Sequence, residues 1–331
     1  MNRLAIIGAG SWGTALAIAV SSRFDEIRIW AREPKRAADI ARSGENSRYL
    51  PGFRLPENVS VSSDLEAALK GAAYVLSAVP SAHLRNVFTA AHDYVHPDAV
   101  IVSATKGIEE RSLKRMSQVL AETLGMGPGR IGVLSGPAFA KEVAAGEPAA
   151  VVIAAAESAL AARLQHAFAT TALRLYTSSD VVGVEVGAAL KNVIAIGAGI
   201  CRGLGLGSNC IAALVTRGLA EITRLAVKMG GDPRTLSGLA GLGDLVLTAT
   251  GDLSRNRYVG VRLGQGHKLN DILSAMPMIA EGVATCSAAY QLGIQYEADL
   301  PIVAQMHAVL YEGKDPREAV RELMDRPLTC E

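Results

Sequence analysis

The sequence predicts two domains, a doubly wound α/β domain followed by an all-α domain. The length of 331 residues exceeds the usual size of one domain and favours two. Short apolar runs alternate with helical segments up to about residue 177, which is typical of a sheet with helices on both faces. Beyond Ser179 the apolar residues recur only at helical spacing. We therefore expect one domain over residues 1–179 and a second over residues 180–331.

The strands of the first domain are expected at short runs rich in valine, isoleucine and alanine. Because these runs are apolar throughout, they predict a parallel sheet that is covered on both faces. The predicted strands are Leu4–Ile7, Ile27–Trp30, Tyr74–Ala78, Val100–Ser103, Ile131–Leu134, Ala150–Ile153 and Leu173–Tyr176. The helices predicted between them include Thr14–Ser22, Asp64–Lys70, Ser112–Leu124 and Ser158–Phe168.

The second domain is expected to consist of helices alone. Its predicted segments are Val184–Ile200, Asn209–Met229, Pro233–Leu239, Leu242–Thr250, Tyr258–Gly264, Asp271–Ala275, Ala284–Leu292, Pro301–Tyr311 and Pro316–Met324. Gly230 and Gly231 end one helix and Pro233 begins the next, because glycine commonly follows a helix end and proline fits a first turn.

The charges of the chain nearly cancel. With 33 basic and 32 acidic residues, no overall field attracts nucleic acid or an anionic membrane surface. The most apolar stretch, residues 181–200, contains Glu185 and Lys191, which would be costly in lipid. We therefore expect neither a nucleic-acid partner nor a membrane span.

The cysteines and the N-terminus indicate a cytoplasmic protein. The spacing typical of a metal site or a secreted disulfide framework is absent among the four cysteines, which are Cys201, Cys210, Cys286 and Cys330. The apolar run after Arg3 ends at Gly8 and is too short for a signal peptide. Because the histidines also lack ligand spacing, we expect no metal.

A glycine-rich segment lies between the first predicted strand and the first predicted helix. Residues 8–13 read Gly-Ala-Gly-Ser-Trp-Gly, which fits the GxGxxG pattern. Gly8 permits the tight turn, Gly10 lets the backbone approach a pyrophosphate, and Gly13 allows close packing of helix and strand. The N–H groups at the start of the helix then face the anion. The segment therefore predicts a bound dinucleotide.

The end of the second predicted strand bears on which dinucleotide is bound. NAD-specific sites usually place an acidic residue there, against the ribose hydroxyl. This chain has Arg32 followed by Glu33. Arg32 can stack on adenine and pair with a 2′-phosphate, which favours NADP, whereas Glu33 is compatible with NAD. We expect both dinucleotides to be used; the alternative is that Arg32 is an ordinary solvated loop residue.

Two lysines occupy positions that suit substrate chemistry. Lys191 lies among small and apolar residues of a predicted helix, and a buried lysine can exchange a proton with a substrate oxygen. The alternative is that Lys191 extends its ammonium group to the surface. Lys106 follows a buried strand, where ligands of parallel sheets bind and where a cation suits a phosphorylated substrate. An ordinary surface position is equally compatible with Lys106.

Further polar side chains follow the glycine-rich turn at residues 238–243. Asp244 and Thr248 are four residues apart and would share one helix face, where they could meet a substrate hydroxyl and an active lysine. A carboxylate in a first helical turn also occurs without any substrate. Residues 251–257, which include Ser254, Arg255 and Asn256, then form a polar turn between predicted helices. Such a turn can bind a phosphate, and an ordinary basic loop is the alternative.

Together these residues resemble the NAD(P)-dependent glycerol-3-phosphate dehydrogenase family of bacterial type, over essentially the whole chain. The matching segments are Gly8–Ala15, Tyr49–Pro51, Thr105–Gly107, Gly136–Ala140, Leu190–Asn192, Thr216–Gly218, Gly241–Asp244, Ser254–Asn256 and Glu281–Gly282. A single GxGxxG segment is a weak signal, whereas this set of segments is specific.

The resemblance implies a Rossmann-like domain, a helical domain similar to the C-terminal domain of 6-phosphogluconate dehydrogenase, and a site in the cleft between them. It implies NAD(P)H as the cofactor and a small phosphorylated substrate, dihydroxyacetone phosphate, which is reduced to sn-glycerol 3-phosphate for phospholipid synthesis. A cytoplasmic homodimer is implied as well.

The resemblance also implies roles for particular residues. Lys191 is the implied general acid–base residue, and Asp244, Asn192 and Thr248 complete the catalytic group. The implied substrate contacts are Lys106, Gly136, Lys191, Asp244, Ser254, Arg255 and Asn256. The cofactor contacts, with the glycines of the GxGxxG segment included, are Gly8, Gly10, Ser11, Trp12, Gly13, Arg32, Lys106, Ala140, Arg255, Ile279 and Glu281.

The chain departs from the family pattern at two of these segments. Ala138 stands where the family commonly has serine, so a hydroxyl contact is lost and no side-chain role is carried over to this position. The backbone of Gly136 and Ala140 can still serve. Ile279 replaces the usual valine beside the cofactor, a change in volume that should be tolerated.

Two other functions share parts of this pattern. A hydroxy-acid dehydrogenase of the 3-hydroxyisobutyrate type would have the same dinucleotide domain and a catalytic lysine, but its substrate would be a carboxylate. Residues 241–244 and 254–256 argue against it. A dinucleotide sensor without turnover would need an output surface, and the near-neutral charge argues against DNA binding.

Overall fold

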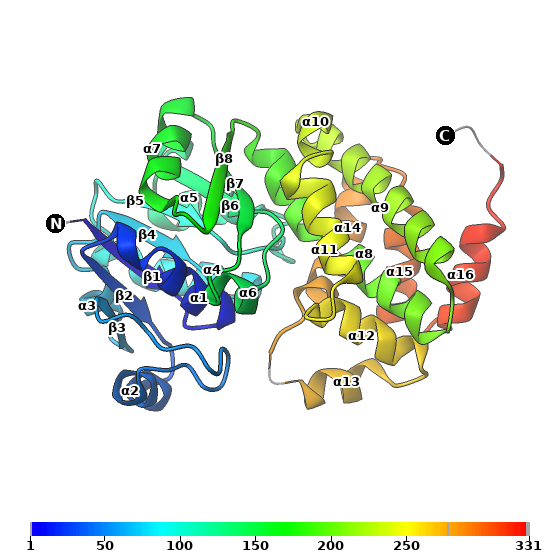
Figure 1. The fold of residues 1–331 in the computed structure, drawn as a ribbon. Helices are drawn as coiled ribbons and strands as arrows, with labels where there is room; N and C mark the ends of the chain where they lie inside the picture. The colour runs from blue at the N-terminus through cyan, green and yellow to red at the C-terminus, as the bar shows by residue number, and fades with distance from the viewer. Residues whose placement is uncertain (1, 277, 329–331) are drawn as a thin grey trace. The chain divides into compact units, whose positions relative to one another are not determined.

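The computed structural model describes residues 2–276 and 278–328, and the chain divides into two compact units. The first unit comprises residues 1–106 and 114–185, and the second comprises residues 107–113 and 186–331. Figure 1 shows a sheet with helices in the first unit and helices in the second. The predicted class, a doubly wound α/β part followed by an all-α part, is therefore confirmed.

One eight-stranded sheet forms the centre of the first unit, in the order β3-β2-β1-β4-β5-β6-β7-β8. Its strands are β1 (Arg3–Ile7), β2 (Glu26–Trp30), β3 (Val59–Ser62), β4 (Tyr74–Ser77), β5 (Val100–Ser103), β6 (Ile131–Ser135), β7 (Ala149–Ala155) and β8 (Leu173–Ser178). All of the predicted strands are present, with ends that differ by one or two residues.

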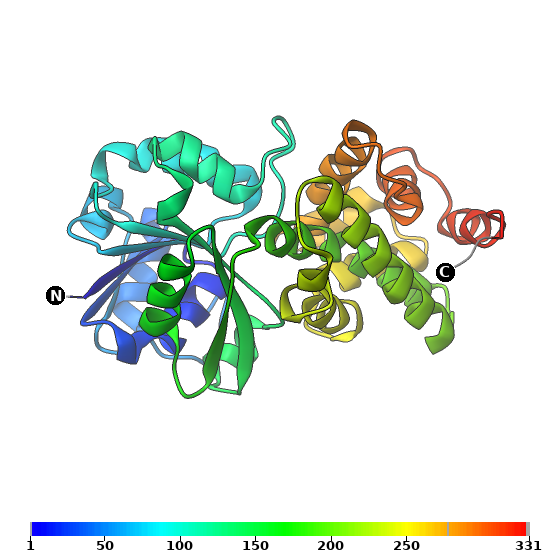
Figure 2. The ribbon, with the colours of Figure 1, turned by 90° about the horizontal axis from the view of Figure 1, so that it is seen from above.

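Helices cover both faces of this sheet, as the apolar strands predict. Side chains of β1 alternate between two cores: Leu4 and Ile6 join the core with Phe168, whereas Ala5 and Ile7 join the core with Phe88. Figure 2 shows helices on either side of the strands. They are α1 (Ser11–Ala19), α2 (Pro34–Ser43), α3 (Leu65–Leu69), α4 (Ser81–Ala91), α5 (Met116–Leu124), α6 (Ala140–Ala144) and α7 (Ser158–Phe168), with 3-10 turns η1 (Ser21–Arg23), η2 (His92–Tyr94) and η3 (Pro128–Arg130).

The sheet differs from the prediction in two respects. The edge strand β3 was not predicted, because its Val-Ser-Val-Ser sequence lacks a continuous apolar run. In addition, β7 runs antiparallel to β6, although the other neighbours are parallel. The connection from β6 to β7 contains only α6, a helix of five residues. That helix is too short to return along the length of a strand, so the chain reverses direction.

The helices of the second unit follow one another along the chain. They are α8 (Val181–Gly203), α9 (Ser208–Lys228), α10 (Pro233–Leu236), the π-helical turn η4 (Leu239–Gly243), α11 (Asp244–Thr250), α12 (Arg255–Gly264), α13 (Leu269–Ala275), α14 (Glu281–Gln295), α15 (Pro301–Tyr311) and α16 (Pro316–Met324). The first five residues of α8 belong to the first unit. The polar turn expected at residues 251–257 is shorter in the structure and covers residues 251–254, because Ser254 caps α12 and Arg255 begins this helix.

The long helix α8 is a core helix. Its 23 residues are apolar enough to cross a membrane by length and composition, but 89% of the apolar window is buried inside the protein. Close packing against α12 depends on glycine, since a Cβ on Gly199 would overlap the Arg257 carbonyl oxygen and one on Gly260 would overlap that of Ile196. The backbones of α8 and α12 therefore touch, which fixes the register of the two helices.

A buried carboxylate joins α9 to α15. Glu221 is 1% exposed, and its two oxygens accept hydrogen bonds from the backbone N–H groups of Ile302 (2.6 Å) and Val303 (3.1 Å). Burial raises the pKa of Glu221 to about 7, although these N–H groups oppose the shift. Glu221 thus supplies the N-terminus of α15 with a cap from another helix.

Two of the cysteines lie together, which their sequence spacing did not predict. The Sγ atoms of Cys201 in α8 and Cys210 in α9 are 3.3 Å apart. Cys201 is buried, and burial raises its pKa to about 12, whereas Cys210 is half-buried. The short link between α8 and α9 brings the two thiols to one side of the pair of helices.

Candidate active site

The glycine-rich segment forms the turn between β1 and α1. Gly8 has a φ of +120°, and a Cβ there would lie 2.7 Å from the Ala78 carbonyl oxygen. A Cβ on Gly13 would overlap the Gly8 carbonyl oxygen, so both positions need glycine. A Cβ on Gly10 would meet nothing within 4 Å, and α1 has no side-chain cap. The backbone N–H groups of the first turn of α1, beginning at Ser11, therefore suit the binding of a pyrophosphate.

Other residues expected at the cofactor lie beside α1. Trp12, Ala138 and Ala140 all pack against one small apolar cluster, made of Ala15, Leu50, Val143 and Ala144. The methyl group of Ala138 contributes to this apolar packing at the position where serine is usual. Within the described residues the buried Trp12 Nε1 has no hydrogen-bond partner.

The end of β2 leads to two cations, Arg32 and Arg36. Arg32 and Glu33 are both exposed. The Glu33 carboxylate pairs with Arg36 at 2.7 Å, and the Arg36 guanidinium lies 4.6 Å from the centre of the Tyr49 ring. Arg36 was not among the predicted site residues, because a lysine- and arginine-rich helix start gives no distinctive signal. Its position makes it a second cation near the expected adenosine ribose.

Lys106 lies at the carboxyl edge of the sheet, as expected for a residue that follows β5. Its Nζ donates to the Gly136 carbonyl oxygen at 3.3 Å. Gly136 follows β6 with a φ of +147°, and a Cβ there would lie 2.8 Å from Val151 Cα. The structure therefore brings these two predicted substrate contacts together in the first unit.

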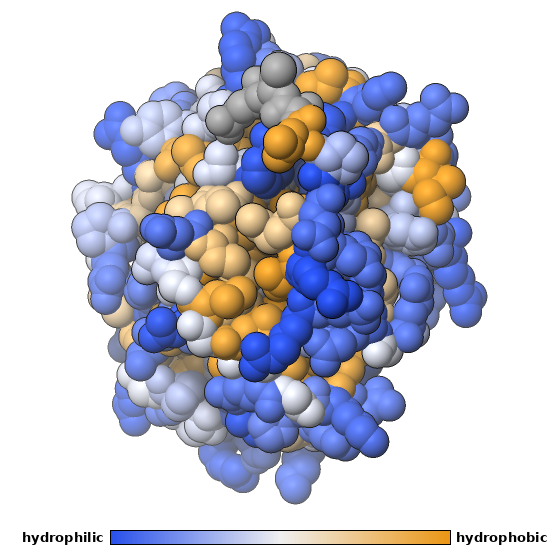
Figure 3. Space-filling model, turned by 90° about the vertical axis from the view of Figure 1, so that its right-hand side faces the viewer, coloured by the Kyte–Doolittle hydropathy of each residue, from blue (hydrophilic) through white to orange (hydrophobic). Residues whose placement is uncertain are grey.

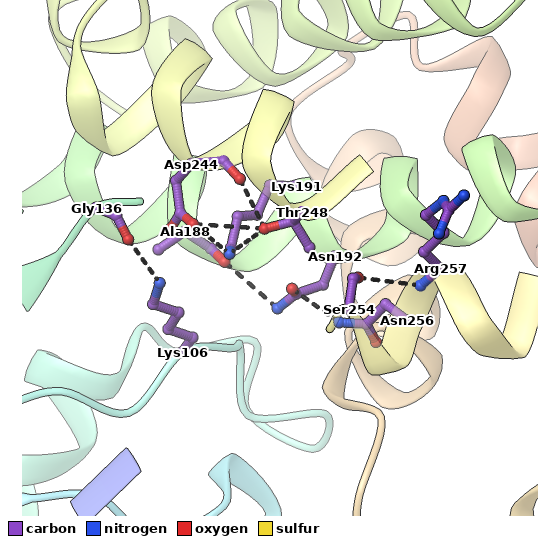
Figure 4. A network of polar contacts seen from close by, with 10 residues as sticks. All are labelled: Lys106, Gly136, Ala188, Lys191, Asn192, Asp244, Thr248, Ser254, Asn256 and Arg257. Carbon is purple, nitrogen blue, oxygen red and sulfur yellow. Dashed lines mark hydrogen bonds and ion pairs between the residues drawn. The ribbon is translucent and has the colours of Figure 1, made fainter. Parts of the chain in front are cut away.

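Lys191 is buried in α8, which excludes the surface-reaching alternative. It is 5% exposed, and its Nζ donates to Asp244 Oδ1 at 2.5 Å and to Thr248 Oγ1 at 2.6 Å (Figure 4). The Thr248 hydroxyl in turn donates to the Asp244 backbone oxygen at 2.6 Å. Because an ammonium group is costly to bury without a counter-charge, the nearly buried Asp244 holds Lys191 as an ion pair.

A π-helical turn positions Asp244 for this contact. The turn η4 immediately precedes Asp244, and π-helical turns often occur at functional sites. A Cβ on Gly187 of α8 would lie 3.0 Å from the Ala240 carbonyl oxygen, so α8 approaches η4 closely. Asp244 lies in the first turn of α11, as the alternative expected, but the N-cap is Gly243. Its carboxylate faces Lys191 instead.

A chain of amides lies next to the lysine. The Gly282 N–H donates to Asn256 Oδ1 at 2.9 Å, and Asn256 Nδ2 donates to Asn192 Oδ1 at 2.9 Å. Since a backbone N–H can only donate, it fixes the orientation of the Asn256 amide and, through it, that of Asn192. A Cβ on Gly282 would lie 2.6 Å from the Asn192 backbone oxygen. Gly282 is therefore needed for this arrangement, although the sequence offered no role for it.

The residues around the start of α12 have distinct contacts. The Ser254 hydroxyl caps the helix by accepting from the Arg257 N–H at 3.2 Å, and a guanidinium nitrogen of Arg255 donates to the Ile279 backbone oxygen at 2.8 Å. Arg257 pairs with exposed Asp252 at 2.7 Å. Glu281 begins α14 and is half-buried. Ser254 and Asn256 thus lie at a helix N-terminus, which suits an anion.

The described residues contain no group of three or more histidine, cysteine, aspartate or glutamate side chains that could hold a metal ion. Two sets of polar groups are present instead. One is the turn of β1 and α1 with Lys106 in the first unit, and the other surrounds Lys191 in the second. Sheet, GxGxxG turn and buried lysine define a two-domain nicotinamide-dependent dehydrogenase.

Comparisons with known proteins identify the family. Residues 3–161 match the profile described as NAD-dependent glycerol-3-phosphate dehydrogenase N-terminus, and residues 180–321 match that of the C-terminus. The chain therefore belongs to the NAD-dependent glycerol-3-phosphate dehydrogenase family. It is 52% identical to glycerol-3-phosphate dehydrogenase [NAD(P)+] of Koribacter versatilis, a match covering 100% of this chain and 99% of the relative.

Solved structures agree with this assignment. The crystal structure of glycerol-3-phosphate dehydrogenase from Coxiella burnetii has a TM-score of 0.94 and 39% identity, covering 98% of this chain and 99% of that one. A ketopantoate reductase from Ralstonia eutropha JMP134 has a TM-score of 0.64 and 18% identity, covering 96% and 99%. This second likeness shows the fold alone.

Proposed function

We propose that the protein catalyses the reversible reduction of dihydroxyacetone phosphate to sn-glycerol 3-phosphate with NADH or NADPH. As a member of its family, the protein is an NAD(P)-dependent dehydrogenase. The observation that carries the substrate chemistry is the buried ion pair of Lys191 and Asp244. A fixed ammonium group can protonate the alkoxide that forms when a ketone accepts a hydride.

The residues of the first unit fit a dinucleotide. The open Gly10 position and the uncapped start of α1 accommodate a pyrophosphate where a side chain would interfere. When bound, the reduced dinucleotide supplies a hydride to the carbonyl carbon. Gly8, Gly13 and Trp12 shape the turn and its surroundings, and Ala140 packs beside them.

Lys191 acts as the proton donor in the reduction and as the acceptor in the reverse direction. Its Nζ gives a proton to the carbonyl oxygen, and solvent restores the proton afterwards. Asp244 keeps the amine protonated, and Thr248 fixes its position by accepting a hydrogen bond. Asn192 and Asn256 orient the substrate. Their side-chain amides are hydrogen-bonded to each other, and the Gly282 N–H fixes which way they face.

The phosphate of the substrate is assigned to cationic and helix-terminal groups. Ser254 and Asn256 lie at the N-terminus of α12, and Arg255 supplies a guanidinium group there. Lys106 and the Gly136 backbone are assigned to the substrate as well. The dinucleotide is assigned contacts with Arg255, Ile279 and Glu281. Arg255 and Ile279 lie next to each other, because the Arg255 guanidinium donates a hydrogen bond to the Ile279 backbone oxygen.

The test is reduced-dinucleotide oxidation, followed by absorbance, with dihydroxyacetone phosphate as substrate. Lys191→Ala should lower the rate by about 10²–10⁴ if proton donation is its main role. Lys228→Ala, at an exposed position of α9, is the matched control and should leave the rate unchanged. Near-normal turnover by Lys191→Ala would refute the role of this residue. Turnover of a hydroxy acid but not of glycerol phosphate would favour the related dehydrogenase class, and dinucleotide binding without any turnover would favour a sensor.

Use of both dinucleotides is the finer proposal for the first unit. Arg32 is exposed and suits a 2′-phosphate, whereas the Glu33 carboxylate, which pairs with Arg36, remains nearby for a ribose hydroxyl. Arg32→Ala should raise the KM for NADPH more than the KM for NADH. Equal effects on the two KM values would show that Arg32 does not read the 2′-phosphate.

We further propose a cytoplasmic homodimer that supplies glycerol phosphate for phospholipid synthesis. Figure 3 shows apolar side chains gathered among hydrophilic ones on one face of the molecule. An apolar patch of this kind fits an interface between copies of a chain. Light scattering should give twice the mass of the chain, and the mass of one chain would refute the dimer.

A further inference from the structure

We propose that Asn46 is a positioning residue for the dinucleotide: with Thr14, it turns the peptide groups of the GxGxxG segment so that their N–H groups face the pyrophosphate. This proposal rests on the proposed function only in that a nicotinamide dinucleotide binds at this segment. Asn46 lies outside the short segments on which the family resemblance was based. It lies in the loop between α2 and β3, far from the glycines in sequence.

The Asn46 side chain is buried against the glycine-rich turn. It is 1% exposed, and its Nδ2 donates to the Ala9 carbonyl oxygen at 3.0 Å and to Thr14 Oγ1 at 2.8 Å. Thr14, also 1% exposed, donates its single hydroxyl hydrogen to the Gly10 carbonyl oxygen at 2.8 Å. The Thr14 oxygen must therefore accept from Asn46, which requires a side chain with two N–H hydrogens.

These contacts set the direction of two N–H groups. In a trans peptide the C=O and the following N–H lie in one plane and point in opposite directions. Because Asn46 draws the Ala9 oxygen inward, the Gly10 N–H points the other way, toward the open side of the turn. The Gly10 oxygen accepts from both the N–H and the hydroxyl of Thr14, at 3.0 Å and 2.8 Å, which directs the Ser11 N–H in the same way. The two side chains also keep the carbonyl oxygens away from a bound anion, which they would repel.

The unpaired oxygen of Asn46 supports a role in orientation. Within the described residues, Asn46 Oδ1 is buried and has no hydrogen-bond partner. A buried acceptor without a partner costs stability, so an asparagine is a poor choice for packing alone. The loop itself is held independently of this side chain, since the Asn46 backbone oxygen accepts from the Leu50 N–H at 2.8 Å and Leu50 packs in the cluster beside α1.

The test compares two asparagine-to-aspartate variants in the full chain. Asn46→Asp keeps the shape of the side chain but removes the N–H groups that donate to the Ala9 oxygen and to Thr14 Oγ1. A carboxylate then faces the Ala9 oxygen. The matched control is Asn58→Asp, because Asn58 Nδ2 also donates to two carbonyl oxygens, those of Ser21 and Phe24, each at 2.9 Å. The readouts are the dissociation constants of NADH and NADPH by calorimetry without substrate, and the unfolding temperature.

We expect Asn46→Asp to weaken both dinucleotides by roughly 5- to 100-fold, by an equal factor for each, since the effect acts at the shared pyrophosphate. Asn58→Asp should lower the unfolding temperature but leave both dissociation constants unchanged. Unchanged affinity in Asn46→Asp, or equal losses in the two variants, would overturn the proposal. If Asn46→Asp does not fold, Thr14→Val decides: it should weaken both dinucleotides, and unchanged binding would overturn the proposal.

Failure of the proposed function gives a different result. If the unaltered protein binds neither NADH nor NADPH, the dinucleotide assignment and the role of Asn46 both fall. If it binds them but does not reduce dihydroxyacetone phosphate, only the substrate assignment falls. Amide hydrogen exchange adds a readout without ligand, because the Gly10 and Ser11 N–H groups should exchange faster in Asn46→Asp than in Asn58→Asp.

Discussion

Removing the charge of Asp244 should move the alkaline limit of activity to lower pH. Asp244→Asn keeps the size of the side chain and one oxygen, but it removes the charge that lies 2.5 Å from Lys191 Nζ. The two side chains are 1% and 7% exposed, so water cannot replace the lost charge. The variant therefore tests whether this carboxylate keeps the catalytic lysine protonated.

The size of the effect follows from the geometry. At 2.5 Å and an effective dielectric constant of about 20, two unit charges attract by about 7 kcal/mol. The asparagine oxygen and Thr248 retain part of this, and removing one partner of a buried pair typically costs about 3–5 kcal/mol. Because the lost attraction acts on the charged form of Lys191, the proton should leave Lys191 at lower pH in the variant.

The assay is the kcat/KM for reduction of dihydroxyacetone phosphate, measured from mildly acidic to alkaline pH. At acidic pH the kcat/KM of the variant should approach that of the unaltered enzyme. As the pH rises, the variant should lose activity at a lower pH than the unaltered enzyme does. Asp232→Asn is the control, because Asp232 pairs with Arg234 at the surface and its loss should leave the profile unchanged. An Asp244→Asn profile with an unmoved alkaline limb would refute the reasoning, whatever its absolute rate.

Three further predictions concern the helical unit. Gly199→Ala should separate α8 from α12, lowering both the unfolding temperature and kcat/KM, whereas Gly207→Ala, which meets nothing within 4 Å, should change neither. Burial raises the pKa of Glu221 from 4.5 to about 7. The free energy of unfolding, measured with urea and compared with that of Glu221→Gln, should therefore fall by about 3 kcal/mol as the pH rises from 4.5 to 7. A difference between the two proteins that does not change with pH would contradict this prediction. Oxidised glutathione should form a disulfide between Cys201 and Cys210 and release two molecules of reduced glutathione. Mass spectrometry should then show that the protein has lost two hydrogen atoms. Two free thiols after this treatment would contradict the prediction.

Much of the fold could be predicted from local pattern. Apolar runs such as Val100–Ser103 became strands because their residues are buried on both faces, and helical spacing after Ser179 became the helices of the second unit. The pattern missed β3, whose alternating serines place it at the sheet edge, and it did not predict the antiparallel β7. Strand direction depends on how a connection packs, which periodicity does not encode.

By itself, the sequence determined the fold class, the dinucleotide turn and the identity of the unusual lysine, because each depends on neighbouring residues. Gly8 and Gly13, for example, meet constraints of a single turn. Only the tertiary structure decided which side chains meet. Lys191 and Asp244 are 53 residues apart, Asn192 and Asn256 are 64 apart, and Asn46 and Thr14 are 32 apart. Such contacts arise from packing of whole helices and loops, so no local pattern of residues signals them.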